Sequence, residues 1–265
     1  MLCSWQEPPQ GIHSRTRRSH AANVFALQAD RPTVVLVHGA FAESSSWNGV
    51  VSRLQSEGLP VLAIANPLRG LANDAEYLRS VIDRIDGPVV VAGHSYGGSV
   101  ASEATEGAGN VRALVFVASF ILEPGESTGE LAARFPGGEL GPALAPIPYV
   151  AGTESGDDLY IEQDQFRAVF AADVPEDVAA LMAATQRPIA AAALEDKAGR
   201  AGWKNIPSWT LVTLNDLAIP AESQRFMAAR AQSQAVEIVA SHAVTVSEPG
   251  AVADLILAAV RETAR

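Results

Sequence analysis

The sequence of 265 residues has a single cysteine, Cys3, and no run of 18 or more apolar residues. One thiol excludes an internal disulfide framework and a cysteine-ligated metal site. The lack of a long apolar run excludes a membrane-spanning helix, and no membrane partner is expected. Lys and Arg number only 19 against 30 Asp and Glu, and they are scattered except for a group at residues 15–18. This acidic balance argues against a nucleic-acid partner.

Hydrophobic residues make up 48% of the chain and charged residues 18%, which is enough apolar material for one large core. We expect one domain over residues 31–265. Residues 1–30 combine basic residues with a short apolar stretch that Asn23 and Gln28 interrupt, too short for the core of a secretion signal. They are predicted to be a disordered N-terminal extension of a cytoplasmic protein, with secretion as the alternative.

Short β-branched apolar runs alternate with amphipathic stretches from Arg31 onward. This alternation is typical of an α/β fold with a mainly parallel, doubly wound sheet that is buried on both faces. Asn73 and Ser247 are the expected N-cap residues of two of the helices. The expected strands are 33–37, 61–65, 89–92, 113–118, 209–214 and 236–239, and the expected helices are 44–57, 74–85, 98–106, 221–231 and 249–263.

The segment from about 121 to 205 interrupts this alternation. It contains a Gly/Pro-rich patch over 136–148 and helical patterns at 164–171 and 176–185, and no run in it has a convincing strand pattern. Such a segment is too long for a loop. We expect an inserted, mostly helical cap over the carboxyl edge of the sheet, where ligands bind in open α/β folds.

The segment Gly93-His94-Ser95-Tyr96-Gly97-Gly98 directly follows an expected strand and opens an expected helix. A G-x-S-x-G turn needs its glycines because the serine is in a strained conformation and side chains beside it would clash with the strand or helix. This context predicts Ser95 as an exposed nucleophile at a helix N-terminus. The alternative is a tight turn that happens to carry a serine.

A nucleophilic serine needs a base, and the chain has five histidines. His13 and His20 lie in the N-terminal extension, whereas His38 and His94 lie in turns expected to shape the site. His242, in a loop just past the last expected strand, is the remaining candidate for the base.

An acid that orients the base is expected at a strand end between the two. Asp216 has this place, and the order Ser95, Asp216, His242 is Ser-Asp-His. The alternatives are that Asp216 only caps the helix after Pro220, or that Glu123 is the acid.

Two backbone N–H groups are expected to form an oxyanion hole. One is that of Tyr96, which follows the nucleophile, and the other is that of Ala40 in the loop after the first strand. Phe41 is the alternative second donor. The simpler interpretation of this loop is an ordinary glycine turn after a buried strand.

Taken together, four segments resemble the conserved blocks of α/β-fold hydrolases over roughly residues 32–263. The resemblance is greatest to the small-cap branch with plant methyl esterases, hydroxynitrile lyases and bacterial esterase-like proteins. It implies a triad of Ser95, Asp216 and His242 and no cofactor. The segments are Val37-His38-Gly39-Ala40-Phe41, Gly93-His94-Ser95-Tyr96-Gly97-Gly98, Asn215-Asp216-Leu217-Ala218-Ile219-Pro220 and Ser241-His242.

Departures from these relatives narrow the expected chemistry. The lyases of the branch carry threonine and lysine where this chain has Gly39 and Ala243, which disfavours cyanohydrin cleavage. Dehalogenases and epoxide hydrolases have aspartate at the position of Ser95, which disfavours both activities.

Phe41, Trp47, Tyr96 and Phe120 lie beside the predicted site loops and are expected to bound the substrate pocket. No cluster of Arg or Lys is available for a phosphate or a multiply charged acid, so the expected partner is a small, neutral, ester-like substrate. Aromatic residues of the cap that could also contribute are Tyr149, Tyr160, Phe166, Phe170 and Trp203.

The sequence therefore predicts a cofactor-independent serine hydrolase, with no metal, that cleaves a carboxylic ester or lactone through an acyl-enzyme on Ser95. One alternative is a perhydrolase of the cofactor-free haloperoxidase type, in which peroxide replaces water. Another is a non-catalytic protein of the same fold that binds a ligand. The oligomeric state is left open, and a homodimer is compatible with the sequence.

Overall fold

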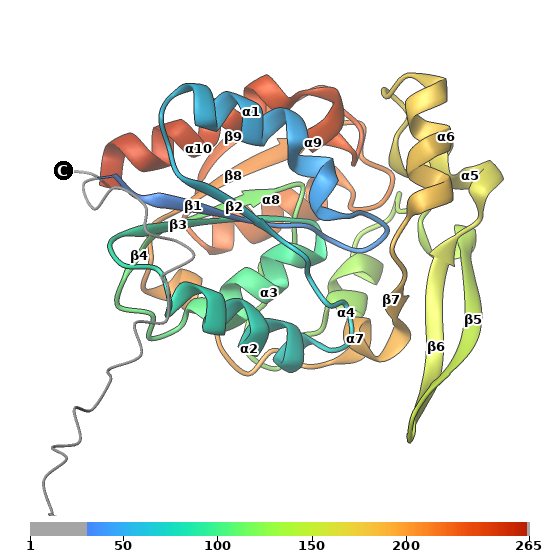
Figure 1. The fold of residues 1–265 in the computed structure, drawn as a ribbon. Coiled ribbons are helices and arrows are strands. Elements are labelled where there is room, and N and C mark those ends of the chain that lie inside the picture. The colour runs from blue at the N-terminus through green and yellow to red at the C-terminus, as the bar shows by residue number, and fades with distance from the viewer. Residues whose placement is uncertain (1–30, 264–265) are drawn as a thin grey trace, which may run out of the picture.

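The computed structural model describes residues 31–263, whose centre is a six-stranded sheet in the order β2-β1-β3-β4-β8-β9 (Figure 1). Every neighbouring pair in it is parallel. Within the described range, no helix is both long and apolar enough to cross a membrane. The predicted N-terminal extension, residues 1–30, lies outside the described residues. The strands are β1 (Thr33–Val37), β2 (Val61–Ile64), β3 (Val89–His94), β4 (Val111–Val117), β8 (Ser208–Thr213) and β9 (Gln234–Ile238).

Helices cover both faces of this sheet (Figure 1). Because side chains alternate along a strand, neighbouring residues belong to different cores. Val35 and Val91 pack in one core, and Val34 and Val90 pack in the other. The first core also takes side chains from α2 (Leu71–Ile82), α3 (Tyr96–Thr105) and α8 (Ala221–Arg230), and the second from α1 (Asn48–Ser56), α9 (Val244–Ser247) and α10 (Pro249–Thr263).

The strand order reverses next to β1. The chain passes from β1 to β2 on one side and then returns to place β3 on the other side of β1. In open α/β sheets the ligand crevice lies beyond the carboxyl ends of the strands at such a reversal. The loop that begins at His38 and the turn at Ser95 leave these two strand ends, so the topology brings them together.

The six predicted strands are confirmed, with each boundary within two residues of the observed one. Asn73 is not an N-cap, because α2 begins at Leu71, whose backbone N–H donates to Asp196 Oδ2 over 2.9 Å. Ser247 is also wrong as an N-cap, because it ends α9, and α10 begins at Pro249. Proline suits a first helical position because it lacks the N–H group that would have no partner there.

The inserted segment has helices at both predicted positions, two shorter helices besides, and a three-stranded antiparallel sheet that the sequence did not indicate. Pro146 and Pro148 lie in β5, which is an edge strand where missing N–H groups are tolerated. Its partner β6 begins with polar residues of low strand propensity. The elements are α4 (Thr128–Ala133), β5 (Leu144–Ala151), β6 (Glu154–Ile161), α5 (Gln163–Phe170), α6 (Glu176–Thr185), β7 (Ile189–Ala190) and α7 (Ala191–Glu195).

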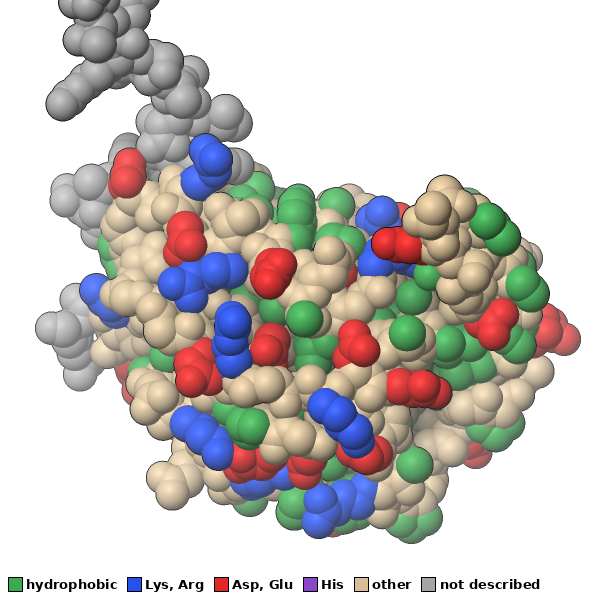
Figure 2. Space-filling view, turned by 90° about the horizontal axis from the view of Figure 1, so that it is seen from below, with side chains coloured by type: hydrophobic (Ala, Val, Ile, Leu, Met, Phe, Trp, Pro, Cys, Tyr) green, Lys and Arg blue, Asp and Glu red, His purple; other side chains and the backbone are tan. Residues whose placement is uncertain are grey.

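Charged side chains of both signs are interspersed on the face seen in Figure 2. Among the described residues, exposed or partly exposed ion pairs include Arg79 with Asp83 and Lys204 with Glu123. Exposed pairs of this kind contribute little to stability, about 0–1 kcal/mol each. This face therefore offers no extended surface of one sign.

Helix α3 begins in close contact with the end of β1. A Cβ atom on Gly97 would lie 2.3 Å from the backbone oxygen of Val37. Real Cβ atoms essentially never approach so closely, and the neighbour is backbone that cannot turn away. Glycine at this position therefore allows the helix to start directly behind the site.

We expect Gly97→Ala to lower the free energy of unfolding by about 1–3 kcal/mol or more, because the added methyl group overpacks this contact. Urea unfolding followed by circular dichroism measures the change. Gly109→Ala is the matched control, because a Cβ atom at Gly109 meets nothing within 4 Å, and it should stay within about 0.5 kcal/mol of the parent. Equal stability of the two variants would contradict the close packing of α3 on β1.

Candidate active site

Ser95 is the turn residue between β3 and α3. Its φ of 54° and ψ of −127° place it in a region that side-chain-bearing residues rarely adopt. Backbone contacts hold the turn: the Ser95 N–H donates to Val117 O over 3.2 Å, and the Ser95 carbonyl accepts from Ser119 Oγ over 2.7 Å. The strain is therefore maintained by neighbouring strands, and the side chain lines a cavity.

Glycines surround this turn where the backbones approach most closely. A Cβ atom on Gly93 would lie 2.5 Å from Gly97 O, so the turn itself leaves no room for a side chain. A Cβ atom on Gly39 would lie 2.6 Å from Ser95 Cβ. The loop after β1 therefore lies directly against Ser95.

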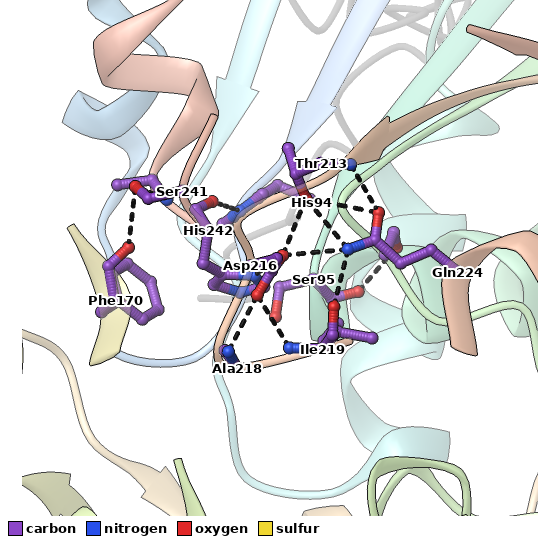
Figure 3. A network of polar contacts seen from close by, with 12 residues as sticks. His94, Ser95, Phe170, Thr213, Asp216, Ala218, Ile219, Gln224, Ser241 and His242 are labelled. Atoms are coloured by element: carbon purple, nitrogen blue, oxygen red, sulfur yellow. Dashed lines mark hydrogen bonds and ion pairs between the residues drawn. The ribbon is translucent and has the colours of Figure 1, made fainter. Parts of the chain in front are cut away.

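His242 and Asp216 form a buried pair, with 2.7 Å between His242 Nδ1 and Asp216 Oδ2 (Figure 3). A carboxylate accepts hydrogen bonds, so Nδ1 carries the proton and Nε2 keeps its lone pair. Within residues 31–263, this buried Nε2 has no hydrogen-bond partner. His94, the residue before Ser95, donates from its Nε2 to the His242 carbonyl over 2.8 Å. This hydrogen bond holds the loop that carries His242 beside the Ser95 turn.

Asp216 follows β8, and hydrogen bonds hold both of its oxygens (Figure 3). Oδ2 accepts from Thr213 Oγ1 over 2.8 Å and from Gln224 Nε2 over 3.0 Å, besides the His242 ring. Oδ1 accepts from the backbone N–H groups of Ala218 and Ile219, each over 2.8 Å. These N–H groups precede α8, whose N-cap is Pro220, so the alternative that Asp216 only caps that helix is wrong. Besides the bond to His242, four hydrogen bonds therefore fix the orientation of the Asp216 carboxylate.

His94 supports the His242 loop from the side of the sheet. The two imidazole rings lie 4.7 Å apart between centroids. Burial lowers the pKa of His94 to about 3, with the nearby His242 acting in the same direction. His94 is therefore neutral at ordinary pH and donates its Nε2 proton to the backbone of His242.

His38 supports the loop after β1 in a similar way. Its Nδ1 donates to Gly39 O over 2.9 Å, and its Nε2 accepts from the Asn66 backbone N–H over 3.0 Å. The Asn66 amide also donates to the His38 carbonyl over 2.9 Å. Burial lowers the pKa of His38 to about 4. The neutral ring thus connects the ends of β1 and β2.

The two expected oxyanion donors are free to bind a ligand. Neither the Ala40 nor the Tyr96 backbone N–H has an acceptor in the described part of the chain. The alternative donor, Phe41, is wrong, because its N–H already donates to Arg187 O over 2.9 Å. The first N–H groups of a helix have no partner within it, so Tyr96 at the start of α3 is suited to hold an anion.

A cavity of about 340 Å³ opens at Ser95. Phe41, Tyr96 and Phe120, which the sequence analysis expects beside the substrate, line this cavity, and no charged residue does so. The Tyr96 hydroxyl is already used, because it donates to buried Asp74 Oδ2 over 2.9 Å. Other lining residues are small or aliphatic and come largely from the first part of the inserted segment: Thr128, Gly129, Ala132, Ala133, Gly138, Leu140, Gly141, Pro142, Leu144 and Leu194.

Several other residues that were candidates for the site do not line this cavity. Trp47 is wrong as a pocket residue, because it is fully buried in the second core, where its ring packs edge-on to His94 at 6.4 Å. Glu123, the alternative acid, forms an ion pair with Lys204 instead. The cap aromatics Tyr149, Tyr160, Phe166, Phe170 and Trp203 are likewise absent from the lining.

Sequence reasoning missed several residues that support the site. Asn66 follows the end of β2, and a polar residue at a strand end was an available signal for it. Thr213, the last residue of β8, had the same signal, whereas Gln224 had none, because its role depends on α8 packing beside the end of β8. Phe170 comes from the inserted segment, and its ring lies 4.8 Å from that of His242.

The model of the alpha/beta hydrolase family matches residues 34–255, and the chain belongs to this family. A curated relative, the alpha/beta hydrolase nvfD of Aspergillus novofumigatus, is 28% identical over 259 residues, covering 88% of this chain and 97% of the relative. A probable hydrolase from a Phoma species is 24% identical and covers 73% of this chain and 81% of its own length.

Solved structures share the fold. Polyneuridine aldehyde esterase superposes with a TM-score of 0.74 at 21% identity, covering 86% of this chain and 98% of its own. A pyrethroid hydrolase from Sphingobium faniae has a TM-score of 0.70 at 19% identity, covering 87% of this chain and 97% of its own. The predicted α/β-hydrolase fold, with methyl-esterase-like relatives, is thereby confirmed.

The lowered pKa of His38 predicts a pH dependence of folding. The unfolded chain binds a proton near pH 6.5, whereas the folded chain binds it only near pH 4. The stabilisation is therefore complete above pH 6.5 and is lost as the pH falls toward 4.

We expect His38→Gln to reduce the slope of unfolding free energy against pH in this window by up to about 1.4 kcal/mol per pH unit, because one proton is no longer taken up on unfolding. Urea unfolding of both proteins at several pH values between 4 and 6.5 measures the slope, whatever the absolute stability of the variant. Identical slopes would contradict a buried, neutral His38.

Proposed function

We propose that this protein is a cofactor-independent serine hydrolase that cleaves a carboxylic ester or lactone, with Ser95 as nucleophile, His242 as base and Asp216 as the orienting acid. The observation that carries the proposal is the arrangement around His242. Its Nδ1 proton is bound by Asp216, while its Nε2 lone pair has no partner among residues 31–263 and lies in the region of the strained Ser95. This is what a general base for a serine requires.

In the proposed reaction, His242 Nε2 takes the proton of Ser95 Oγ as the oxygen attacks the substrate carbonyl carbon. The imidazolium that forms is stabilised by Asp216, which stays ionised. The tetrahedral intermediate collapses, and His242 returns the proton to the leaving alcohol oxygen. A water molecule, deprotonated by His242, then attacks the acyl-enzyme and releases the acid and free Ser95.

The free N–H groups of Ala40 and Tyr96 are the proposed donors to the oxyanion in both steps. They belong to backbone held by close packing, which is the kind of preorganised donor that stabilises a developing negative charge most effectively. Gly39 brings Ala40 to this place, because it allows the loop to lie against Ser95.

The cavity supports a neutral substrate with an apolar acyl group. It has the volume of a small-molecule site, and its lining includes no charged side chain. A carboxylate placed there would lose its water without gaining a partner, which is costly. The names of two relatives, an esterase and a pyrethroid hydrolase, agree with this substrate class.

Cyanohydrin cleavage is disfavoured by the same geometry. The related lyases have a threonine at the position of Gly39, and a Cβ atom there would lie 2.6 Å from Ser95 Cβ in this chain. The loop would have to move away from Ser95 to accept a side chain.

The first test is turnover of p-nitrophenyl acyl esters of increasing chain length. We expect Ser95→Ala to lower turnover by about 10⁴-fold or more, because no other group forms the acyl-enzyme. Ser52→Ala, at an exposed serine on α1, is the matched control and should keep full activity. Retained esterase activity in Ser95→Ala would refute Ser95 as the nucleophile.

Absence of turnover in both proteins would favour the two other functions. A halogenation assay with monochlorodimedone that needs both acetate and peroxide would indicate perhydrolysis at the same serine. A ligand that raises the melting temperature without being consumed would indicate a binding protein.

A second prediction concerns the acyl group. Ala132→Phe places a large ring in the cavity and should lower kcat/KM for long acyl chains by about 10-fold or more while sparing the acetyl ester. The exposed Ala229 on α8 provides the control Ala229→Phe. A chain-length profile that does not change in Ala132→Phe would mean that the acyl group binds elsewhere.

A further inference from the structure

The residues on both sides of His242 are bonded to the inserted cap. The Ser241 backbone N–H donates to Asp173 Oδ2 over 2.8 Å, and the Ser241 hydroxyl donates to Asp173 Oδ1. On the other side, the Ala243 N–H donates to Phe170 O over 2.9 Å. Asp173 and Phe170 lie at the junction of α5 and α6, so this junction holds the loop that carries His242.

The Phe170 side chain adds a ring contact. Its ring is buried and meets the His242 ring edge-on, with 4.8 Å between centroids and 74° between planes. Phe166, one turn earlier on α5, packs against Phe170 at 5.1 Å. Phe170 does not line the cavity, so its ring contacts the His242 imidazole and would not contact a substrate bound in the cavity.

Asp216, in contrast, has no hydrogen bond to the α5–α6 junction. All its hydrogen bonds come from residues on or beside β8, α8 and the His242 loop. Displacement of the α5–α6 junction would therefore remove the cap's hydrogen bonds and the ring contact from the His242 loop, and no hydrogen bond from the carboxylate that orients it. The His242 ring would lose its alignment while Asp216 stayed in place.

We propose that Asp173 and Phe170 are positioning residues, through which the cap holds His242 in its catalytic orientation, so that the base is aligned only while the α5–α6 junction is docked. This inference rests on the proposed function of His242. It makes the cap part of the catalytic machinery and not only a wall of the substrate cavity. Closure of the cap over a bound substrate would then also complete the site.

Asp173 offers a clean test because it is exposed, so its replacement leaves the core intact. Asp177, on the first turn of α6, is an exposed acid of the same cap whose carboxylate has no hydrogen bond or ion pair with another described residue. Asp173→Ala and Asp177→Ala therefore remove the same charge from the same region. Only the first removes contacts with the His242 loop.

Hydrogen–deuterium exchange of the full chain tests the coupling without any substrate. We expect Asp173→Ala to speed exchange at least several-fold in the peptides that contain Ala243 and residues 163–173, because Ala243 N–H and Phe170 O separate more often. Asp177→Ala should leave both peptides at the parent rate. Parent-like exchange in Asp173→Ala would overturn the proposal.

Kinetics tests the consequence. Asp173→Ala should lower kcat by about 10-fold with KM nearly unchanged, because small misplacements of a catalytic group slow the chemical step more than binding. Asp173→Asn keeps one acceptor oxygen and should fall between the parent and Asp173→Ala. Faster exchange without a fall in kcat, or a rise in KM alone, would overturn the positioning role.

The two proposals fail in different ways. A parent chain without Ser95-dependent turnover of any ester would refute the proposed function, while the exchange experiment would still decide whether the cap holds the loop. Ser95-dependent turnover that is indifferent to Asp173→Ala would refute the positioning role alone.

Discussion

The site depends on a backbone constraint at Ser95. This residue keeps a positive φ only because the ends of β1, β3 and β4 hold the turn on all sides, and glycines at positions 39, 93 and 97 leave room for them to meet. The same close approach places the Ala40 and Tyr96 N–H groups beside the serine. Strain in one residue thus brings together the proposed nucleophile and the two proposed oxyanion donors.

His242 is held from three independent directions. Asp216 binds its ring, neutral His94 binds its backbone, and the cap junction binds the residues before and after it. Two of these supports belong to the central sheet and one to the cap. The proposed alignment of the base by the cap depends on the last of these supports.

Much of the molecule could be predicted because buried parallel strands have a strong pattern. All six strands, helix α6 and the positions of Ser95, Asp216 and His242 at strand ends follow from apolar periodicity and from the order of turns. The β5–β6 hairpin could not be predicted, because two prolines and a polar partner strand hide its pattern. Trp47 was assigned to the pocket because it is near the loop in sequence, but its side chain points into the opposite core.

The sequence alone determined the α/β architecture and the residues that could carry chemistry, because strand periodicity and the G-x-S-x-G turn are local properties of the chain. Only the tertiary structure decided which N–H groups are free, which side chains line the cavity and which residues hold the histidine. Phe41 N–H is used by Arg187, and Asp173 reaches Ser241 across 68 positions of sequence. Such contacts depend on how distant segments pack, and no local pattern encodes them.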